Sequence, residues 1–254
     1  MFIQTITPKI GPKLQNIYRG GEGPPLVWVH GLPGVKIGDP LLSELEKTHT
    51  VIAPEMPGRK DLNDIEQMND VRDLALYYDS LLDELGVENA ALSGHSFGGM
   101  LAGEMAALAP HRFKSLTLIS PFGLWNDAAP VADIFARPQA EIDTLLWSGG
   151  SKPPEHPSAA VGEAAIEAMV ETVNALGSVA KFTWPIPEKG LRRRLYRVSM
   201  PTLVVFGASD AVVPASYADE FVKAIPGAKK LMLKGSHMIP FEQPNEIAAA
   251  IRSL

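Results

Sequence analysis

The sequence contains no cysteine. A disulfide framework, a thiolate metal site and a thiol nucleophile are therefore excluded. Histidine, the other common metal ligand, occurs six times, and no two of these residues stand at the HxxxH spacing of a helical zinc site. We accordingly expect neither a metal ion nor any other cofactor.

Long apolar runs are also missing. No stretch approaches the roughly 20 residues that a membrane span requires, and the beginning, MFIQTITPKIGPK, lacks the basic and apolar regions of a secretory signal. These absences favour a cytoplasmic protein that does not associate with a membrane.

Positive charge is scarce. Lys and Arg number 23 against 29 Asp and Glu, a net charge of -6, whereas nucleic-acid-binding proteins concentrate Lys and Arg on one face. The only basic run, Arg192 to Arg194, is interpreted as a solvated helix face. We therefore expect a small-molecule substrate and no nucleic-acid partner, in a protein that is a monomer or a homodimer.

Short apolar runs bounded by turn residues alternate with helical patterns along most of the chain. Strands are predicted at residues 26–30, 51–53, 90–92, 115–119, 202–206 and 231–233, and helices at 68–85, at 97–109, before Pro226 and at 245–253. This alternation predicts an α/β fold with a mostly parallel central sheet flanked by helices on both faces.

The stretch 122–190 breaks this alternation. It shows helical patterns but no convincing strand, and it contains the loop WSGGSKPPEHPS. We predict a core formed by residues 1–121 and 191–254, with residues 122–190 as a helical insertion carried on it.

The strongest chemical signal is Gly94-His95-Ser96-Phe97-Gly98, which fits G-x-S-x-G between a predicted strand and a predicted helix. A serine on such a tight turn leaves no room for side chains two residues away on either side. The helix start also points free N–H groups toward charge that develops above the serine. The pattern predicts Ser96 as a nucleophile; the alternative is a glycine-rich helix start without catalysis.

A serine nucleophile requires a general base that is oriented by an acid. Asp210 and His237 each follow a predicted strand and come after Ser96 in the chain order typical of G-x-S-x-G hydrolases. We predict Asp210 as the acid and His237 as the base. The alternatives are that Asp210 is a structural aspartate at a turn and His237 a structural histidine in a loop. Asp127 and Asp219 remain alternative acids.

Acyl transfer also needs donors for an oxyanion. The backbone N–H of Phe97 follows the nucleophile, and Leu32 in HGLPG offers a second N–H, since Pro33 has none. We predict an oxyanion hole formed by Leu32 and Phe97, although HGLPG can also be a simple turn. His30 and His95 flank this site, and we expect them to hold loops.

With HGLPG, APEMPG, GHSFGG, FGASD and GSHMIPFEQP in this order, the chain resembles the α/β-hydrolase fold superfamily over nearly its whole length. The resemblance implies the same nucleophile, acid, base and oxyanion donors. It also implies that residues 122–190 form the helical cap that such enzymes place above the triad.

Two departures from the resemblance bear on function. Many relatives carry D-x-P-G-x-G-x-S where this chain reads EMPGRKD. We expect no functional role for Glu55 in that loop; the alternative is a polar role near the cavity. Carbon–carbon hydrolases often have Trp after the base, where this chain has Met238. Relatives with an aspartate nucleophile are excluded by Ser96.

The insertion holds three of the four tryptophans. Trp125, Phe135, Trp147 and Trp184 are predicted to line an apolar pocket; the alternative for each is packing against the core. We therefore predict an enzyme that cleaves a carboxylic ester or lactone of a small, largely apolar substrate through an acyl-enzyme. A carbon–carbon bond hydrolase and a small-ligand receptor of the same fold remain alternatives.

Overall fold

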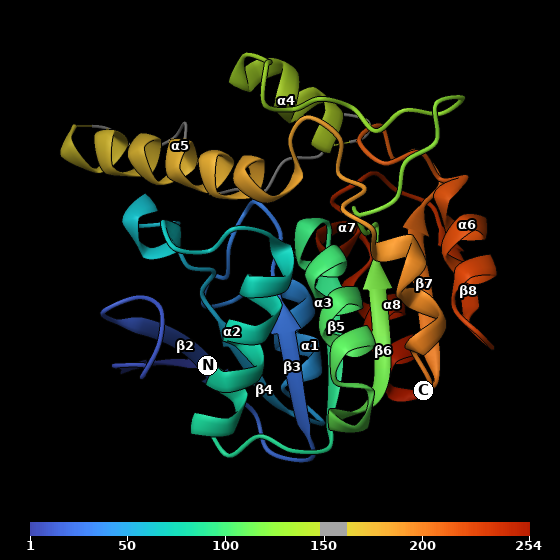
Figure 1. The fold of residues 1–254 in the computed structure, drawn as a ribbon, viewed down its shortest axis with the longest axis horizontal. Helices are drawn as coiled ribbons and strands as arrows, with labels where there is room; N and C mark the ends of the chain where they lie inside the picture. The colour runs from blue at the N-terminus through green and yellow to red at the C-terminus, as the bar shows by residue number, and fades with distance from the viewer. Residues whose placement is uncertain (148–161) are drawn as a thin grey trace.

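The computed structural model describes residues 1–147 and 162–254. An eight-stranded sheet runs through the molecule in the order β1-β2-β4-β3-β5-β6-β7-β8 (Figure 1). Its strands are β1 (Phe2–Ile6), β2 (Gln15–Gly20), β3 (Pro25–Val29), β4 (Thr50–Pro54), β5 (Ala90–His95), β6 (Phe113–Ile119), β7 (Thr202–Gly207) and β8 (Lys229–Leu233).

The strands from β3 to β8 pair in parallel, whereas β1 and β2 join one edge in antiparallel fashion. The six predicted strands are β3 to β8, and the predicted α/β fold with a mostly parallel sheet is confirmed. The sequence patterns did not predict β1 and β2. β1 is largely solvent-exposed, so burial imposes little apolar pattern on it.

Helices cover both faces of the sheet. On one face α2 (Val71–Glu84), α3 (Phe97–Leu108) and α6 (Tyr217–Ala224) bury their apolar sides in the larger core cluster. On the other face α1 (Pro40–Leu45) and α8 (Pro244–Arg252) contribute to the smaller one. The remaining helices of the core are α7 (Ile239–Glu242) and the 3-10 turns η1 (Leu62–Ile65), η2 (Pro110–Arg112), η5 (Leu191–Arg193) and η6 (Leu195–Arg197).

Among the residues of the segment 122–190 that the structure describes, two α-helices occur, α4 (Gln139–Leu146) and α5 (Glu163–Thr183). Both lie beyond the carboxyl ends of the parallel strands (Figure 1). No strand occurs within residues 122–147 or 162–190. The predicted loop WSGGSKPPEHPS, apart from Trp147, falls outside the described residues. Within the described ranges, no helix is long and apolar enough to cross a membrane.

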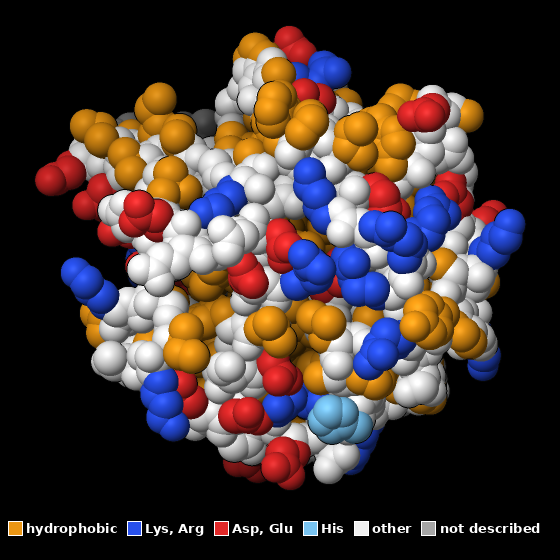
Figure 2. All heavy atoms as spheres, in the orientation of Figure 1, with side chains coloured by type: hydrophobic (Ala, Val, Ile, Leu, Met, Phe, Trp, Pro, Cys, Tyr) orange, Lys and Arg blue, Asp and Glu red, His pale blue; other side chains and the backbone are white. Residues whose placement is uncertain are grey.

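The outward side of α5 is apolar. Its exposed side chains include Ile166, Met169, Val170 and Val173, which recur at helical spacing, and Figure 2 shows apolar side chains gathered over this helix. The opposite side of α5 contacts the core, where Val179 and Phe182 are buried. The helix therefore presents apolar residues on two sides.

The basic run at residues 192–194 is not simply a solvated face, contrary to the interpretation from the sequence. The Arg194 guanidinium donates two hydrogen bonds, of 2.7 and 2.6 Å, to the carboxylate of Glu104, which is fully buried in α3. Arg192 pairs with Glu220 at 2.5 Å. A buried carboxylate needs a charged partner, and the run supplies it.

Candidate active site

Ser96 occupies the turn between β5 and α3. Its backbone has a φ of 58° and a ψ of -123°, in the left-handed region that residues other than glycine rarely adopt. A Cβ at Gly94 would collide with the carbonyl oxygen of Gly98, and one at Gly98 with that of Val29. Both glycines of the motif are thus required by close backbone approach, as the sequence pattern indicated.

The side chains of Ser96, His237 and Asp210 form one continuous chain of hydrogen bonds. The Oγ of Ser96 lies 2.8 Å from Nε2 of His237. Nδ1 of the same imidazole lies 2.9 and 3.1 Å from the two carboxylate oxygens of Asp210. Residues separated by up to 141 positions in the sequence therefore meet in an arrangement that can move a proton from a hydroxyl to an imidazole.

Asp210 is oriented from two sides. Its Oδ1 accepts the backbone N–H groups of Val212 and Val213, each at 2.9 Å. Burial by itself raises the pKa of this carboxyl, but the attraction and hydrogen bond of His237, together with the Ser120 hydroxyl and the Val213 amide, lower it below its usual value. The carboxylate is thus held ionised next to the imidazole.

The two alternative acids lie elsewhere. Asp127 accepts a hydrogen bond from Nε1 of Trp125 at 2.7 Å, and Asp219 forms an exposed ion pair with Lys230. Neither is hydrogen-bonded to His237. Of the three aspartates considered from the sequence, the structure brings only Asp210 to the histidine.

The HGLPG loop passes directly over the serine. A Cβ placed on Gly31 would lie 2.9 Å from Cβ of Ser96, so only glycine allows this approach. Within the part of the chain that the structure describes, the backbone N–H groups of Leu32 and Phe97 donate to no protein acceptor. Phe97 begins α3, where the first N–H groups of a helix have no partner inside it.

His30 and His95 are buried and hold backbone groups of the two loops. Nε2 of His30 accepts the N–H of Met56 at 2.8 Å, so its Nδ1 carries the proton and donates to the carbonyl of Gly31 at 2.7 Å. Nε2 of His95 lies 2.8 Å from the carbonyl oxygen of His237. Burial lowers the pKa of His30 to about 4 and that of His95 to about 3, which keeps both rings neutral.

A cavity of about 560 Å³ lies beside Leu32 and Met238, between the HGLPG loop, α4 and α5. Its apolar wall includes Leu146, Trp147 and Phe241, and the Trp147 and Phe241 rings meet edge to face with centroids 5.7 Å apart. Polar side chains also line it, namely Lys36, Asp39, Arg59, Gln139, Asp143, Glu171 and Thr172. The cavity is therefore less uniformly apolar than the sequence predicted.

Of the four aromatic residues predicted to line a pocket, only Trp147 lies on the wall of this cavity. Trp125 and Phe135 pack against the larger core cluster. Trp184, which follows the last residue of α5, is 55% exposed and is not part of the cavity lining. Being aromatic and lying in the insertion was therefore not enough to predict that Trp125, Phe135 and Trp184 line this cavity.

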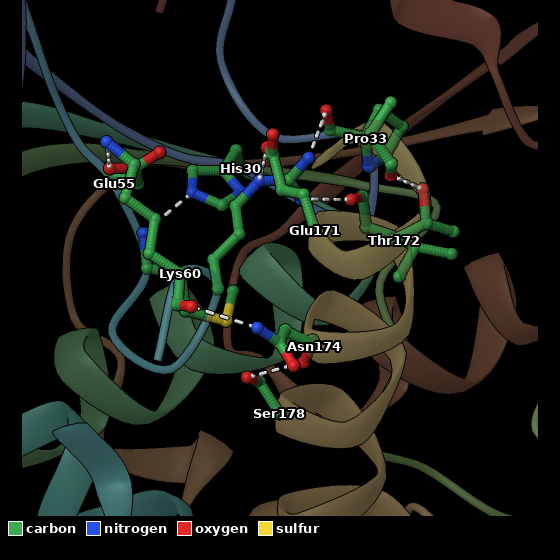
Figure 3. Close-up of polar contacts among 12 residues, drawn as sticks. His30, Pro33, Glu55, Lys60, Glu171, Thr172, Asn174 and Ser178 are labelled. Atoms are coloured by element: carbon green, nitrogen blue, oxygen red, sulfur yellow. Dashed lines mark hydrogen bonds and ion pairs between the residues drawn. The ribbon is translucent and has the colours of Figure 1, made fainter. Parts of the chain in front are cut away.

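Two further residues of the EMPGRKD loop have clear contacts (Figure 3). The Glu55 carboxylate accepts a hydrogen bond from Asn16 at 3.1 Å and pairs with Lys60 at 3.4 Å, away from the cavity lining. Arg59, in contrast, lines the cavity and contacts the HGLPG loop. Arg59 belongs to no motif of the sequence, and the only signal near it is that EMPGRKD departs from the D-x-P-G-x-G-x-S pattern.

No group of His, Asp and Glu side chains able to hold a metal ion occurs among residues 1–147 and 162–254. The polar groups around Ser96 are hydroxyl, imidazole, carboxylate and amide groups, whose chemistry is proton transfer and hydrogen bonding.

Comparisons with curated proteins give several relatives. The chain is 26% and 30% identical to the dihydrolipoyllysine-residue acetyltransferase components of the acetoin cleaving systems of Cupriavidus necator and Pseudomonas putida, over 95% and 94% of its length. It spans 66% of the length of each of these two proteins. It is also 25% identical to pyrrolizixenacetamide deacetylase of Xenorhabdus hominickii, covering 96% of both chains.

Solved structures share the fold at low identity. A bacterial membrane phospholipase A matches with a TM-score of 0.77 and 20% identity, over 99% of this chain and 84% of that one. Carboxylesterase CesB from Bacillus subtilis matches with a TM-score of 0.74 and 18% identity, over 99% and 90% of the two chains. The family model described as "Alpha/beta hydrolase family" matches residues 26–250. The chain belongs to the alpha/beta hydrolase family.

Proposed function

We propose that the chain is a serine hydrolase that cleaves a carboxylic ester or lactone of a small, largely apolar substrate through an acyl-enzyme. The observation that carries this proposal is the hydrogen-bonded chain from Ser96 through His237 to Asp210, with distances of 2.8 and 2.9 Å. Nucleophile, base and orienting acid within hydrogen-bond reach of one another are the geometric signature of this chemistry.

In the proposed reaction Ser96 Oγ attacks the carbonyl carbon while Nε2 of His237 takes the hydroxyl proton. The resulting imidazolium is stabilised by the Asp210 carboxylate. Collapse of the tetrahedral intermediate breaks the bond to the alcohol oxygen, which leaves with the proton from His237. Water then attacks the acyl-enzyme by the same sequence, and the products are the carboxylic acid and free Ser96.

Leu32 and Phe97 are the proposed oxyanion donors. Two observations support this role: both amides lack a protein acceptor in the described ranges, and Gly31, the residue before Leu32, approaches Ser96 closely. Removing one such donor typically costs about 10²–10³ in rate. The N-terminus of α3 adds a favourable dipole for the developing negative charge.

The segment 122–190 is proposed to act as a cap that selects the substrate. Support comes from α4 and α5, whose residues line the cavity opposite the HGLPG loop. A volume of about 560 Å³ falls within the roughly 300–1,000 Å³ range of small-molecule sites. Leu146, Trp147, Met238 and Phe241 supply an apolar wall, which suits a short to medium acyl group or a cyclic lactone.

The names of the relatives are compatible with acyl chemistry. One is a deacetylase over nearly the full length of both chains, and two are acetyltransferase components. Acetamides therefore belong in the substrate panel beside esters and lactones.

The test is hydrolysis of a chain-length series of p-nitrophenyl esters, aryl acetamides and lactones by the wild type and by Ser96→Ala. We expect a maximum at short to medium chain length and a loss of at least about 10³-fold in kcat for Ser96→Ala. Circular dichroism shows whether the variant keeps its fold. Equal activity of a folded Ser96→Ala, or no activity of the wild type on the whole panel, contradicts the proposal.

A further inference from the structure

Arg59 connects two elements that the proposed reaction needs. Its guanidinium lies between the HGLPG loop and α5, and its side chain is only 12% exposed. Nη1 donates to the carbonyl of Leu32 at 2.6 Å and Nη2 to that of Pro33 at 3.2 Å. Nε donates to the carboxylate of Glu171 on α5 at 2.7 Å; Glu171 and Pro33 are labelled in Figure 3.

These contacts fix the backbone that carries the proposed oxyanion donor. The N–H of Leu32 and the carbonyl of Gly31 belong to one planar peptide unit and point in opposite directions. The Gly31 carbonyl is held by Nδ1 of His30 at 2.7 Å and by the N–H of Gly34 at 3.1 Å. Arg59 holds the carbonyls of the next two residues, so three successive carbonyl groups have fixed partners.

The planar guanidinium suits this task. A guanidinium presents its donors in a rigid fork, so contacts to Leu32 and Pro33 set the orientation of the loop as well as its position. The loop itself contains Gly31 and Gly34, and Gly34 has a φ of 79°. Glycines widen the range of backbone conformations, and without the fork the loop has more orientations available.

Glu171 ties this fork to α5, and other contacts attach the helix independently. Nδ2 of Asn174 donates to the carbonyl of Lys60 at 2.9 Å, and Nζ of Lys181 donates to that of Ile65 at 2.6 Å. The loss of the Glu171 carboxylate therefore removes the link to Arg59 while α5 remains attached to residues 60–65.

We propose that Arg59 is a positioning residue that aligns the Leu32 N–H for the oxyanion, and that Glu171 couples this alignment to helix α5. The inference rests on the proposed function. Arg59 suits this role by its position. It follows Met56, whose amide is held by His30, and its side chain reaches the cavity wall. The contact of Glu171 makes the oxyanion loop sensitive to how α5 packs, and thereby to what fills the cavity beneath the helix.

The test compares Arg59→Gln, Arg59→Lys and Glu171→Gln with the wild type on the best ester of the panel. We expect Arg59→Gln to lower kcat by about 10–100-fold, less than the full loss of a donor, with KM changed less than about threefold. A trifluoromethyl ketone with the same acyl chain forms an oxyanion on Ser96, and its Ki should rise by the same factor as kcat falls. The Ki of the corresponding methyl carbinol, which forms none, should not change.

Lysine provides one point charge in place of a fork, so Arg59→Lys should regain part of the loss. Glu171→Gln keeps both contacts to the loop carbonyls and should lose about threefold to tenfold. Glu167→Gln, an exposed position one turn earlier on the same helix, is the matched control and should match the wild type.

A folded Arg59→Gln with wild-type kcat and wild-type ketone Ki overturns the inference alone, because the wild type in the same assay is active. Equal losses in ketone and carbinol affinity also overturn it, since they indicate general damage to the cavity. If Arg59→Gln fails to fold, Glu171→Gln decides, and wild-type behaviour there overturns the coupling. A wild type that neither hydrolyses the panel nor binds the ketone overturns the proposed function together with this inference.

Discussion

Helix α3 carries one fully buried carboxylate, and its partner decides how much stability the pair contributes. Glu104 is 0% exposed, whereas the side chain of Arg194 keeps 19% of its surface in contact with solvent. The two bonds between them, at 2.7 and 2.6 Å, have the bidentate geometry of a strong charge-assisted pair. Substituting Arg194 and substituting Glu104 should therefore lower the free energy of unfolding by different amounts.

Arg194→Met leaves the Glu104 carboxylate buried without a charge partner. Breaking a buried pair in this way costs about 3–5 kcal/mol, which for a chain of this length lowers Tm by roughly 6–20 °C. Glu104→Leu is milder, at about 1–2 kcal/mol, because Arg194 can turn toward water and still donates to the Lys189 carbonyl at 2.9 Å. The double variant should lie within about 2 kcal/mol of the wild type, since apolar residues often replace a buried pair without loss.

Urea denaturation at pH 7, followed by circular dichroism, gives the free energy of unfolding for all four proteins. Arg112 offers a comparison with Arg194. It forms ion pairs with Asp79 and Asp83 of α2, and both of these acids are partly exposed. If Arg194→Met loses less than about 1 kcal/mol, or if the two single losses add in the double variant, the Glu104 carboxylate is not dependent on Arg194.

Three further predictions concern the site and its surroundings. Asp210→Asn should keep the backbone contacts to Val212 and Val213 yet lower kcat about 10⁴-fold, because it cannot hold the imidazole in the required tautomer; steady-state kinetics beside a thermal melt measure this. Burial raises the pKa of Asp39 to about 6, so the native state binds more protons than the unfolded chain between about pH 4 and 6, and stability falls as pH rises through that window. Asp39→Asn retains an N-cap side chain and should lose this part of the pH dependence, gaining on the wild type at pH 8 relative to pH 4; a parallel pH profile of both melts refutes it. Gly98→Ala should fold poorly or lose activity, since its Cβ meets the carbonyl of Val29, whereas Gly227→Ala, where a Cβ meets nothing but φ is positive, should cost about 1 kcal/mol and leave kcat unchanged.

Strands β3 to β7 could be predicted from the sequence because most of their residues are buried. A strand such as Leu26 to Val29, whose residues are all buried, reads as an uninterrupted apolar run. The two antiparallel strands carry no such pattern: in β1, Phe2 is 59% and Ile3 47% exposed, and β2 reads QNIYRG. Their place in the sheet comes from pairing with distant residues, which short local patterns do not encode.

Local capping side chains set where helices α1 and α2 begin. The helix expected from residue 68 begins at Val71, because the Asp70 carboxylate accepts the N–H of Arg72 at 2.7 Å and so caps the helix at that residue. Helix α1 has the same kind of cap in Asp39. Its six residues are too few for a periodic apolar pattern, so it was not predicted.

At the site, motif and chain order led to Ser96, Asp210 and His237, and the structure brings their side chains within hydrogen-bond distance. The partnership of Arg59 with Glu171 spans 112 positions and leaves no pattern in a single sequence. Trp147 and Trp184 could not be told apart from the sequence either, because both are tryptophans of the insertion. Trp147 lies on the cavity wall, whereas Trp184 lies at the surface. Contacts between distant segments, not residue types, make these distinctions.

Ser96 is the proposed nucleophile, and every step of the proposed reaction depends on it. Incubation with a fluorophosphonate, followed by peptide mass spectrometry, tests this assignment without any assumption about the substrate. We expect a single phosphonate on the peptide that contains Ser96, no labelling of folded Ser96→Ala, and labelling slowed at least about 10²-fold in His237→Gln. Labelling that survives in Ser96→Ala, or an adduct on another residue of the wild type, would contradict the assignment.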